Sequence, residues 1–277
     1  MKKIAVLPNS AKDTDLVNTT HVVKYLLGKA ELYMPAEYGI IGGGVNYVSE
    51  DEIYKNVDTA VVLGGDGTII QIATGCAKNN ISVLGINLGT IGFMTEVEVE
   101  NIDASLDKLL SGNYKTENRM LLKTEIFKDG KLFAAHHALN DVVVSKTIGE
   151  KLIRLELFTD GETVNRYVAD GLIIATPTGS TGYSISAGGP VVDPNMQLYI
   201  ATPICAHMLS VRSAVLSAEK EIKIQIDGAD AVVTADGDVQ GCIGDGDFVK
   251  ITKSKYTFKL IKTENQSFYE TLLSKLN

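Results

Sequence analysis

The spacing of hydrophobic and polar positions changes near residue 119, and this change divides the chain into two parts. In the first part, short apolar runs alternate with stretches of helical spacing. This alternation predicts a parallel sheet whose ligands bind beyond the carboxyl ends of the strands. The expected strands lie at residues 4–7, 31–34, 60–63 and 81–86, the expected helices at 13–27, 69–78 and 102–110, and a glycine-rich loop at 39–46.

The second part alternates polar and apolar residues with a period of two, most clearly at 153–157 and 222–226. Asp-Gly pairs separate strand-like runs there, at 129–130, 160–161 and 227–228. This pattern predicts antiparallel strands joined by hairpins.

The predicted fold class is therefore α/β plus all-β. We expect an N-terminal parallel α/β sheet domain over residues 1–118, followed by an antiparallel β-sandwich-like domain over 119–256. Helical spacing returns at Ser267–Leu276. The C-terminal segment, about residues 257–277, is accordingly expected to return to the first domain.

Composition narrows the possible functions. The 277 residues are 45% hydrophobic and 22% charged, as in an ordinary soluble globular chain. A net charge of -8 argues against nucleic-acid binding through a basic surface. The cysteines and histidines show no metal or redox spacing. The apolar run near the N-terminus is too short for a signal peptide, and no segment approaches a membrane span. We expect a cytoplasmic protein without a membrane partner.

The strongest candidate chemistry of the first part follows the apolar run at 60–63. There the chain reads Gly64, Gly65, Asp66, Gly67 and Thr68. A strand, a tight turn and a helix N-terminus together form an anion site, and Thr68 is expected to cap the helix. Asp66 would repel a phosphate unless it orients a metal-bound nucleotide or takes a proton from an attacking hydroxyl. The alternative is that Asp-Gly is simply good turn chemistry.

The segment Asn87–Phe93 follows the next expected strand, so we expect it to share a cleft with Asp66. In the second part, Asn140 and Asp141 open a strand, and an amide beside a carboxylate suits ribose hydroxyls or a base edge. A turn followed by a strand is the simpler alternative there. From 169 to 190, a buried strand leads into a loop rich in hydroxyls and glycines, which favours a ligand site.

Together these motifs resemble the NAD kinase family, which makes NADP from NAD and ATP. The resemblance rests on the glycine motif at 64–68, on Asn140-Asp141, on the block 170–190 and on Pro203–Ser210, and it extends to the segment 267–272. It implies an α/β domain, then a β-rich NAD-binding domain, with the end of the chain returning to the first. Family members form dimers or tetramers, so the resemblance implies a homodimer or homotetramer.

The resemblance also implies roles for individual residues. Asp66 would be the general base that takes the proton from the 2'-hydroxyl of the adenosine ribose of NAD as this oxygen attacks the γ-phosphoryl of Mg-ATP. The sequence has no P-loop lysine, so Mg²⁺ (or another divalent cation) and backbone amides would meet the phosphate charge. Tyr183 would lie against the base of NAD. The substrate-binding and nucleotide-binding residues would be Gly64, Gly65, Gly67, Thr68, Asn140, Asp141, Lys151, Asp170, Thr178, Thr181, Gly182, Tyr183, Ser184, Ile185 and Ser186.

The sequence departs from the family pattern at three positions. Asp141 replaces a common glutamate, Val168 a frequent arginine, and Asp238 the last residue of an Asp-Gly-Gln motif. For Lys151, a solvated lysine is nearly as good an interpretation as phosphate binding.

Two other functions remain as alternatives: a lipid or sugar kinase with the same glycine turn, and a nucleotide-binding sensor that has lost catalysis. Against a lipid kinase, the sequence has no amphipathic basic segment that would bind a membrane surface, and the block 170–190 has no role in such an enzyme. The sensor is expected to lack the base. Product formation separates it from an enzyme, whereas NAD binding does not.

Overall fold

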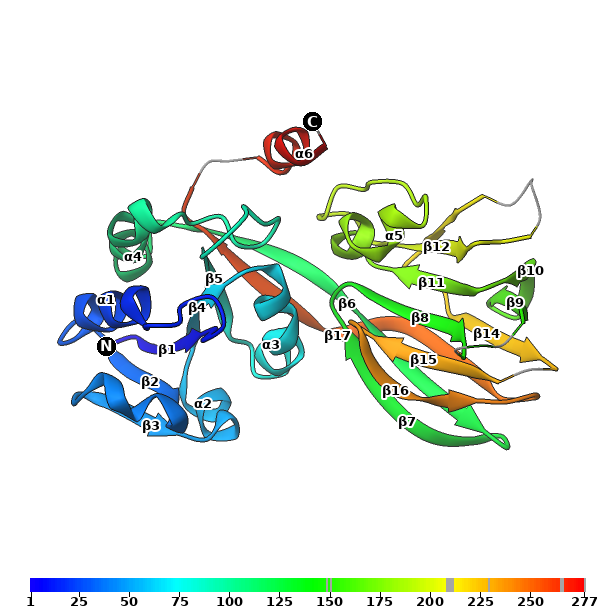
Figure 1. Cartoon of the computed structure of the whole chain (residues 1–277), viewed down its shortest axis with the longest axis horizontal. Coiled ribbons are helices and arrows are strands. Elements are labelled where there is room, and N and C mark those ends of the chain that lie inside the picture. The colour runs from blue at the N-terminus through cyan, green and yellow to red at the C-terminus, as the bar shows by residue number, and fades with distance from the viewer. Residues whose placement is uncertain (148, 150, 208–211, 229, 265–266, 277) are drawn as a thin grey trace. The chain divides into compact units, whose positions relative to one another are not determined.

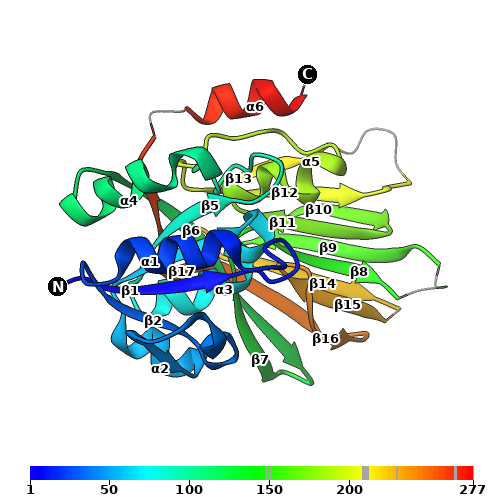
Figure 2. The same cartoon turned by 60° about the vertical axis from the view of Figure 1, so that its left-hand side comes forward.

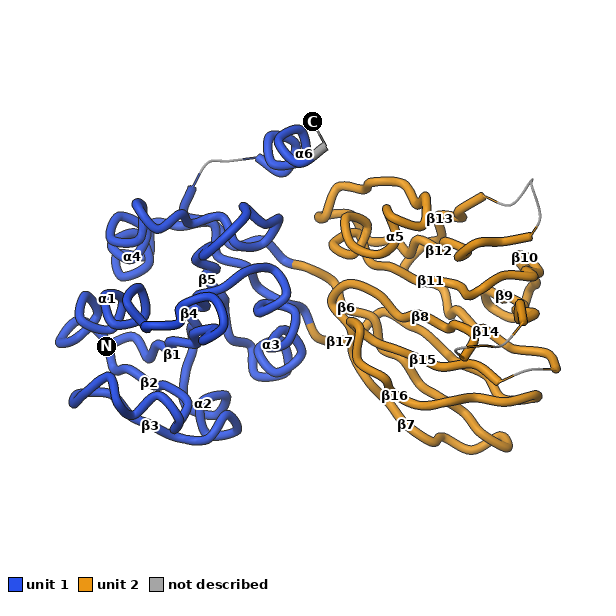
Figure 3. Tube along the Cα trace, in the orientation of Figure 1, with its two compact units in different colours: residues 1–118, 257–277 blue, residues 119–256 orange. Residues whose placement is uncertain are grey.

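The computed structural model describes residues 1–147, 149, 151–207, 212–228, 230–264 and 267–276. It divides into two units, residues 1–118 with 257–277 and residues 119–256 (Figure 3). Strands β6 (Lys115–Lys128) and β17 (Phe248–Lys262) run from one unit into the other.

The first unit contains a parallel sheet with the strand order β17-β5-β4-β1-β2-β3 (Figure 1). This confirms the predicted parallel α/β sheet. The other strands are β1 (Lys3–Pro8), β2 (Glu31–Pro35), β3 (Val45–Val48), β4 (Thr59–Gly64) and β5 (Ser82–Asn87). The helices are α1 (Val17–Leu26), α2 (Glu50–Asn56), α3 (Asp66–Lys78), α4 (Ile102–Ser111) and α6 (Phe268–Leu276), with short 3-10 helices η1 (Ala36–Ile41) and η2 (Val99–Asn101).

Helices cover both faces of this sheet. Leu84 and Ile86 of β5 point to one face, where they share a core with apolar residues of α1 and α4. Successive strand residues point to opposite faces, so Gly85 faces the other side. A Cβ on Gly85 would lie 2.8 Å from Cδ1 of Ile69 in α3. The absence of a side chain at Gly85 therefore lets α3 pack closely on the strand.

The register of the sheet brings three loops to one edge. Pro8 of β1 pairs with Leu63 of β4, and Gly64 of β4 pairs with Asn87 of β5. The loops after β1, β4 and β5 consequently leave the sheet at the same level. In parallel α/β sheets this carboxyl edge is where ligands bind.

Asp13 fixes the first of these loops and the start of α1. Its buried carboxylate accepts hydrogen bonds from the Thr19 N–H at 2.8 Å, the Thr19 hydroxyl at 2.6 Å and the Asn18 N–H at 3.3 Å. Leu16 precedes the helix in a left-handed conformation. Helix α1 therefore begins at Val17, four residues later than the sequence pattern suggests, because residues 13–16 form the cap.

The second unit contains two antiparallel sheets, as predicted (Figure 2). One has the order β13-β12-β11-β8-β15-β16; the other has β10-β9-β14-β17, with β6 paired to β17 and β7. The strands are β7 (Lys131–Ala138), β8 (Asp141–Lys146), β9 (Ile153–Thr159), β10 (Glu162–Ala169), β11 (Gly171–Ala175), β12 (Leu198–Ile204), β13 (Ala214–Ser217), β14 (Ile222–Asp227), β15 (Ala231–Ala235) and β16 (Asp238–Ile243). The short helices η3 (Thr178–Thr181) and α5 (Tyr183–Ser186) follow β11.

The two sheets enclose a common core. Inward residues of β8 and β11, such as Val144 and Ile174, share it with Leu155 of β9 and Ile224 of β14. The opposite face of β11 is also buried, because Ile173 packs in a cluster that includes residues of the segment after α5. Burial on both faces explains why β11 is continuously apolar while β9 alternates.

Three sequence expectations need correction. Asp227-Gly228 is not a hairpin turn, because β14 and β15 belong to different sheets. The expected loop at 39–46 contains the end of η1 and the start of β3, and α2 was not predicted at all. The Asp-Gly turns at 129–130 and 160–161 do join paired strands, with positive φ at both positions of each turn.

We expect Asp13→Ala to lower the free energy of unfolding by about 1–2 kcal/mol at pH 7, since it removes the cap of α1. Burial raises the pKa of Asp13, but hydrogen bonds from Thr19 and Asn18 outweigh it, so this pKa lies below the ordinary value of 3.8. A carboxyl whose pKa is lower in the folded protein than in the unfolded protein stabilises the fold at pH values above the unfolded-state pKa. This stabilisation is lost as the pH falls through the pKa of the folded state. Urea unfolding should show a constant difference between wild type and variant from pH 7 to 5 that shrinks below pH 3.8. A difference that persists at low pH would contradict this role.

Candidate active site

The glycine turn between β4 and α3 leaves little room for side chains. A Cβ on Gly64 would collide with Thr68 Oγ1, and one on Gly65 would lie 2.5 Å from Lys12 Nζ. The φ of Gly65 is -150°, an extended value open to any residue, and the atoms that its Cβ would meet belong to the movable end of the Lys12 side chain. The close packing therefore restricts position 64 and not position 65. At Gly67 an added Cβ would meet nothing within 4 Å. The first turn of α3 is thus open to a ligand at Gly67.

Helix α3 begins at Asp66, with Gly65 as its N-cap. Thr68 therefore does not cap the helix, and this prediction was wrong. Its hydroxyl instead accepts a hydrogen bond from Asn9 Nδ2 at 2.8 Å. This contact joins the glycine turn to the loop after β1.

The Asp66 carboxylate accepts four hydrogen bonds from the loop after β5. Oδ2 accepts one from the Phe93 N–H at 2.7 Å. Oδ1 accepts three, from the N–H groups of Met94 and Thr95 and from the Thr95 hydroxyl, each at 3.1 Å. A carboxylate oxygen has about two lone-pair directions, so Oδ1 is fully used while Oδ2 keeps one for a further donor.

Gly92 allows this arrangement. A Cβ on Gly92 would overlap Asp66 Oδ1 and lie 2.5 Å from Thr95 Oγ1. Phe93, the last residue of the segment 87–93, thus lies against Asp66, whereas a cleft shared by the segment and Asp66 stays a prediction. The ring of Phe93 also packs against Phe268 of α6, with centroids 5.6 Å apart.

In the second unit, Asp236 holds the turn that precedes β8. Its carboxylate accepts hydrogen bonds from the N–H groups of Leu139 at 2.6 Å, Asn140 at 2.7 Å and Asp141 at 3.2 Å. Asp236 and Gly237 have φ values of 51° and 90° and form the turn between β15 and β16. A hairpin turn of one strand pair thereby fixes the backbone of the Asn140-Asp141 motif.

The hydroxyl-rich loop packs on the same turn. The Thr176 N–H donates to Asn140 O at 2.8 Å, and the Thr176 hydroxyl donates to Leu139 O at 2.6 Å. A Cβ on Gly179 would overlap the carbonyl oxygen of Asn140. Glycine at 179 thus permits the direct contact between the loop and the turn.

These contacts create a pocket of about 300 Å³. It is lined by Asn140, Asp141, Val143, Ser145, Tyr183, Thr234, Asp236 and Gly237. The Tyr183 side chain is half-exposed, and Oδ1 of Asn140 is buried without a hydrogen-bond partner among the described residues. The pocket offers an aromatic surface beside an unused acceptor and a carboxyl group, which suits a polar, flat ligand.

Asp141 has an unusual titration. Burial, and then the charge of Asp236, raise its pKa to about 7. Burial also raises the pKa of Asp236, but its three N–H donors oppose this rise. Near neutral pH the Asp141 carboxyl can therefore donate a hydrogen bond as well as accept one.

The other predicted residues of the second unit lie outside this pocket. Ser184 is fully buried and its hydroxyl contacts that of Thr202 at 3.1 Å, so it supports the loop. Asp170 pairs with Lys146 at 2.6 Å. The Thr181 hydroxyl donates to Thr178 O at 3.2 Å. The remaining ones are Gly182, Ile185 and Ser186, in or beside α5, and Lys151, exposed before β9. The expected family segment Pro203–Ser210 ends at 208–210, outside the described residues.

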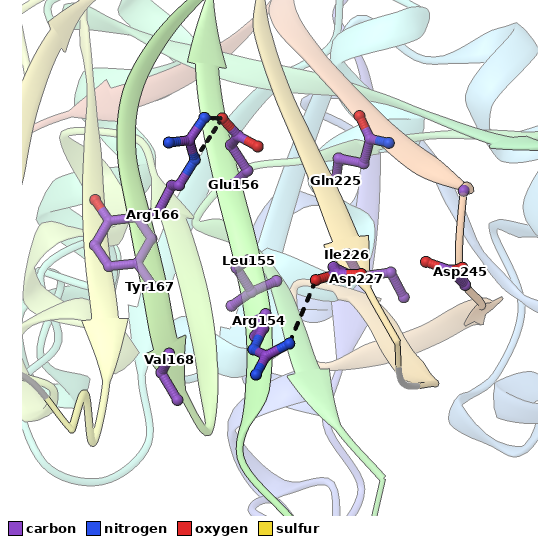
Figure 4. A pocket seen from close by; sticks show the side chains of 11 residues that line it. Arg154, Leu155, Glu156, Arg166, Tyr167, Val168, Gln225, Ile226, Asp227 and Asp245 are labelled. Atoms are coloured by element: carbon purple, nitrogen blue, oxygen red, sulfur yellow. Dashed lines mark hydrogen bonds and ion pairs between the residues drawn. The ribbon is translucent and has the colours of Figure 1, made fainter.

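A larger hollow of about 560 Å³ lies on the β9, β10 and β14 side of the second unit (Figure 4). Both of its arginines are paired: Arg166 Nη2 lies 2.7 Å from Glu156, and Arg154 Nη1 lies 3.6 Å from Asp227. None of the predicted site residues lines it. Arg154 is directly opposite Val168 in the strand pair, so a guanidinium is present beside the position where the family often has arginine.

Three contributors to these sites were missed from the sequence. They are Lys12, the donors of Met94 and Thr95, and Asp236 as the residue that holds the Asn140 turn. The Asp236-Gly237 pair gives a turn signal, and Lys12 follows the first strand, where the carboxyl-edge rule could have placed it. The contacts of Asp66 with backbone N–H groups have no signature in the sequence.

Within the described part of the chain, no three His, Cys, Asp or Glu side chains converge as a metal site. In the same residues, no helix has the length and apolar character needed to cross a membrane.

Comparison with known proteins identifies the family. Residues 12–114 match the ATP-NAD kinase N-terminal domain, and residues 139–263 match the ATP-NAD kinase C-terminal domain. The NAD kinase of Lachnoclostridium phytofermentans is 37% identical over 99% of both chains. That of Thermoanaerobacter sp. is 39% identical over 100% of this chain and 99% of its own. The chain belongs to the NAD kinase family, whose members are phosphotransferases.

Solved structures agree with this assignment. A crystal structure of an NAD kinase from Archaeoglobus fulgidus in complex with ATP has a TM-score of 0.77 and 28% identity, over 99% of this chain and 98% of that one. Yeast NADH kinase complexed with NADH has a TM-score of 0.88 at 24% identity, over 100% of this chain and 87% of that one. At 24% identity, the second likeness concerns the fold.

Asp141→Asn should stabilise the protein at alkaline pH. A folded-state pKa raised to about 7 means that stability falls as the pH rises from about 4 to 7, because the folded state holds a proton that the unfolded state has lost. The variant should exceed wild type by about 1–3 kcal/mol in urea unfolding at pH 8, with the difference closing towards pH 4. A difference in stability that does not change with pH would contradict a buried Asp141 carboxyl with a raised pKa.

Proposed function

We propose that this chain transfers the γ-phosphoryl of ATP to the 2'-hydroxyl of the adenosine ribose of NAD, giving NADP, with Asp66 as the general base. The observation that carries the proposal is the geometry of Asp66. Its carboxylate stands at the start of α3, fixed by four donors, with one acceptor direction left on Oδ2. The relatives that match over the full chain are named NAD kinase, which supports the choice of substrates.

A carboxylate is a weak base, so its contribution depends on position. Phosphoryl transfer asks mainly for alignment of the attacking oxygen and for stabilisation of charge on the transferred group. The free acceptor direction on Oδ2 would receive the hydrogen bond of the 2'-hydroxyl and then its proton. The Phe93 N–H, already bonded to Oδ2 at 2.7 Å, would keep the oxygen oriented during this transfer.

The pocket of the second unit is the proposed NAD site. Asn140 lines the pocket, its buried Oδ1 has no hydrogen-bond partner among the described residues, and the Tyr183 ring offers a surface for a base. The Asp141 carboxyl, with its pKa raised to about 7, can share hydrogen bonds with a hydroxyl in either direction. Its side chain is one methylene shorter than the family's usual glutamate, so the pocket places the carboxyl closer to the β8 backbone.

The proposal includes Mg²⁺ brought by ATP. Mg²⁺ usually binds through substrate phosphates and one or two carboxylates, so it needs no cage of protein ligands. When bound, it would neutralise charge on the phosphates. We also propose a cytoplasmic homodimer or homotetramer, with the scattered free cysteines supporting a reducing compartment.

The test of the base is Asp66→Asn. The substitution keeps the size of the side chain but removes the proton acceptor, so kcat for NADP formation from NAD and Mg-ATP should fall about 10²–10⁴-fold. NAD binding, measured by calorimetry, should change little. Asp51→Asn, in the exposed first turn of α2, is the matched control and should retain wild-type activity.

If Asp66→Asn retains more than a tenth of the wild-type kcat, Asp66 is not the base. If wild type binds NAD but forms no NADP with any phosphoryl donor, the kinase assignment fails and the sensor becomes the better account.

Gly92→Ala tests the support of Asp66. The new Cβ would overlap Asp66 Oδ1, so the carboxylate must move. We expect kcat to fall at least about tenfold, because small displacements of a reacting group are costly. Gly39→Ala, where an added Cβ meets nothing within 4 Å, should be neutral. Equal kcat values for Gly92→Ala and wild type would show that the position of Asp66 is not limiting.

A further inference from the structure

Lys12 lies in the loop after β1, and its backbone is tightly held. Asn9 O accepts hydrogen bonds from the N–H groups of Lys12 at 3.0 Å and Asp13 at 2.9 Å, and Asn9 Oδ1 accepts one from the Ala11 N–H at 3.0 Å. Asn9 itself donates its N–H to Leu63 O of β4 at 2.8 Å. The turn that carries Lys12 is thus attached to the strand that leads into the glycine turn.

The Lys12 ammonium lies over the glycine turn between β4 and α3. A Cβ on Gly65 would be 2.5 Å from Nζ, and one on Gly89 would be 3.7 Å from it. Gly65 follows β4 and Gly89 follows β5, so the Lys12 ammonium lies at the carboxyl edge of the sheet, near the loops that follow these two strands. Both positions are glycine, so no side chain from either one covers the ammonium. Among the described residues Lys12 forms no ion pair, and its side chain is exposed.

A pocket of about 450 Å³ borders this ammonium. Among its described lining residues Lys12 is the one cation, and Glu98 and Glu100 are the acids. The chain as a whole carries a net charge of -8. Within this pocket, Lys12 therefore supplies the positive charge that attracts an anionic ligand, and Glu98 and Glu100 oppose it.

We propose that Lys12 binds the terminal phosphates of the nucleoside triphosphate at the glycine turn. The sequence has no lysine in the glycine loop itself, and Lys12 supplies this charge from the neighbouring loop. The ammonium is exposed and unpaired among the described residues, and it lies beside the N-terminus of α3, where backbone N–H groups also favour an anion. Lys12 would act together with Mg²⁺ and the backbone amides that the sequence predicts to meet the phosphate charge.

The kinetic part of this inference rests on the proposed function, whereas the binding part does not. Lys12→Met removes the charge and keeps the length of the side chain, and Lys12→Arg restores a cation. Lys24→Met, an exposed lysine of α1, is the matched control. All four proteins should unfold within about 2 °C of one another, because both lysines are exposed.

The first measurement is binding of ATP and of AMP by calorimetry without NAD. Wild type should prefer ATP, and Lys12→Met should weaken ATP binding about tenfold or more while AMP binding stays within about twofold. Lys12→Arg should recover part of the loss, and Lys24→Met should match wild type. The second measurement is NADP formation, in which Lys12→Met should raise the KM for ATP by a similar factor and leave the KM for NAD within about twofold.

The outcomes separate the two proposals. If wild type forms NADP but Lys12→Met binds ATP and AMP as wild type does, the role of Lys12 is wrong and the kinase stands. If wild type forms no NADP but Lys12→Met loses the preference for ATP over AMP, the phosphate site stands and the proposed reaction fails. An equal loss of ATP and AMP binding would also overturn the role of Lys12, because the terminal phosphates would not be what it contacts.

Discussion

The hydrogen bonds between the Asp66 carboxylate and the loop at 93–95 are the interaction on which the candidate chemistry depends. They join the start of α3 to the loop after β5, and they orient a carboxylate whose position would otherwise depend on a rotatable side chain. Gly92 makes the close approach possible. The parallel register of β4 and β5 brings the two segments to the same level of the sheet. The architecture of the first unit therefore determines where this one oxygen acceptor stands.

The second unit also has an aspartate carboxylate that accepts hydrogen bonds from backbone N–H groups, but this one orients a turn. Asp236, like Asp66, accepts hydrogen bonds from three consecutive backbone N–H groups of a distant segment. The two units differ in that a second carboxyl, that of Asp141, lies near Asp236. Asp236 is fixed by donors, whereas Asp141 beside it is buried, with its pKa raised to about 7 by that burial and by the charge of Asp236. One aspartate thus shapes the turn, and the other presents a carboxyl group that exchanges its proton near neutral pH.

The elements that govern the fold could be predicted from the sequence because their patterns are local. The apolar run before Gly64 and the alternation at 153–157 predicted a parallel strand and an antiparallel one, and both are present. Boundaries were harder: α1 starts later than its apolar pattern, since Asp13 caps it from four residues before Val17. The strand β3 is short and only partly buried, which leaves a weak pattern.

The motif residues Asp66 and Asn140 could be named from the sequence, but the contacts that orient them come from segments 27 and 96 residues away along the chain. Such contacts depend on tertiary register, so the contacts that Lys12, Gly92 and Asp236 make became visible only in the structure.

In the proposed reaction, the terminal phosphoryl group of ATP moves to the 2'-hydroxyl of the adenosine ribose of NAD. The most direct measurement incubates the wild-type protein with NAD, Mg²⁺ and ATP labelled at the γ-phosphate, and then locates the label. We expect the label on the 2'-phosphate of NADP, with one ADP formed for each NADP. ADP released with the label in inorganic phosphate, or label at another position of NAD, would contradict it.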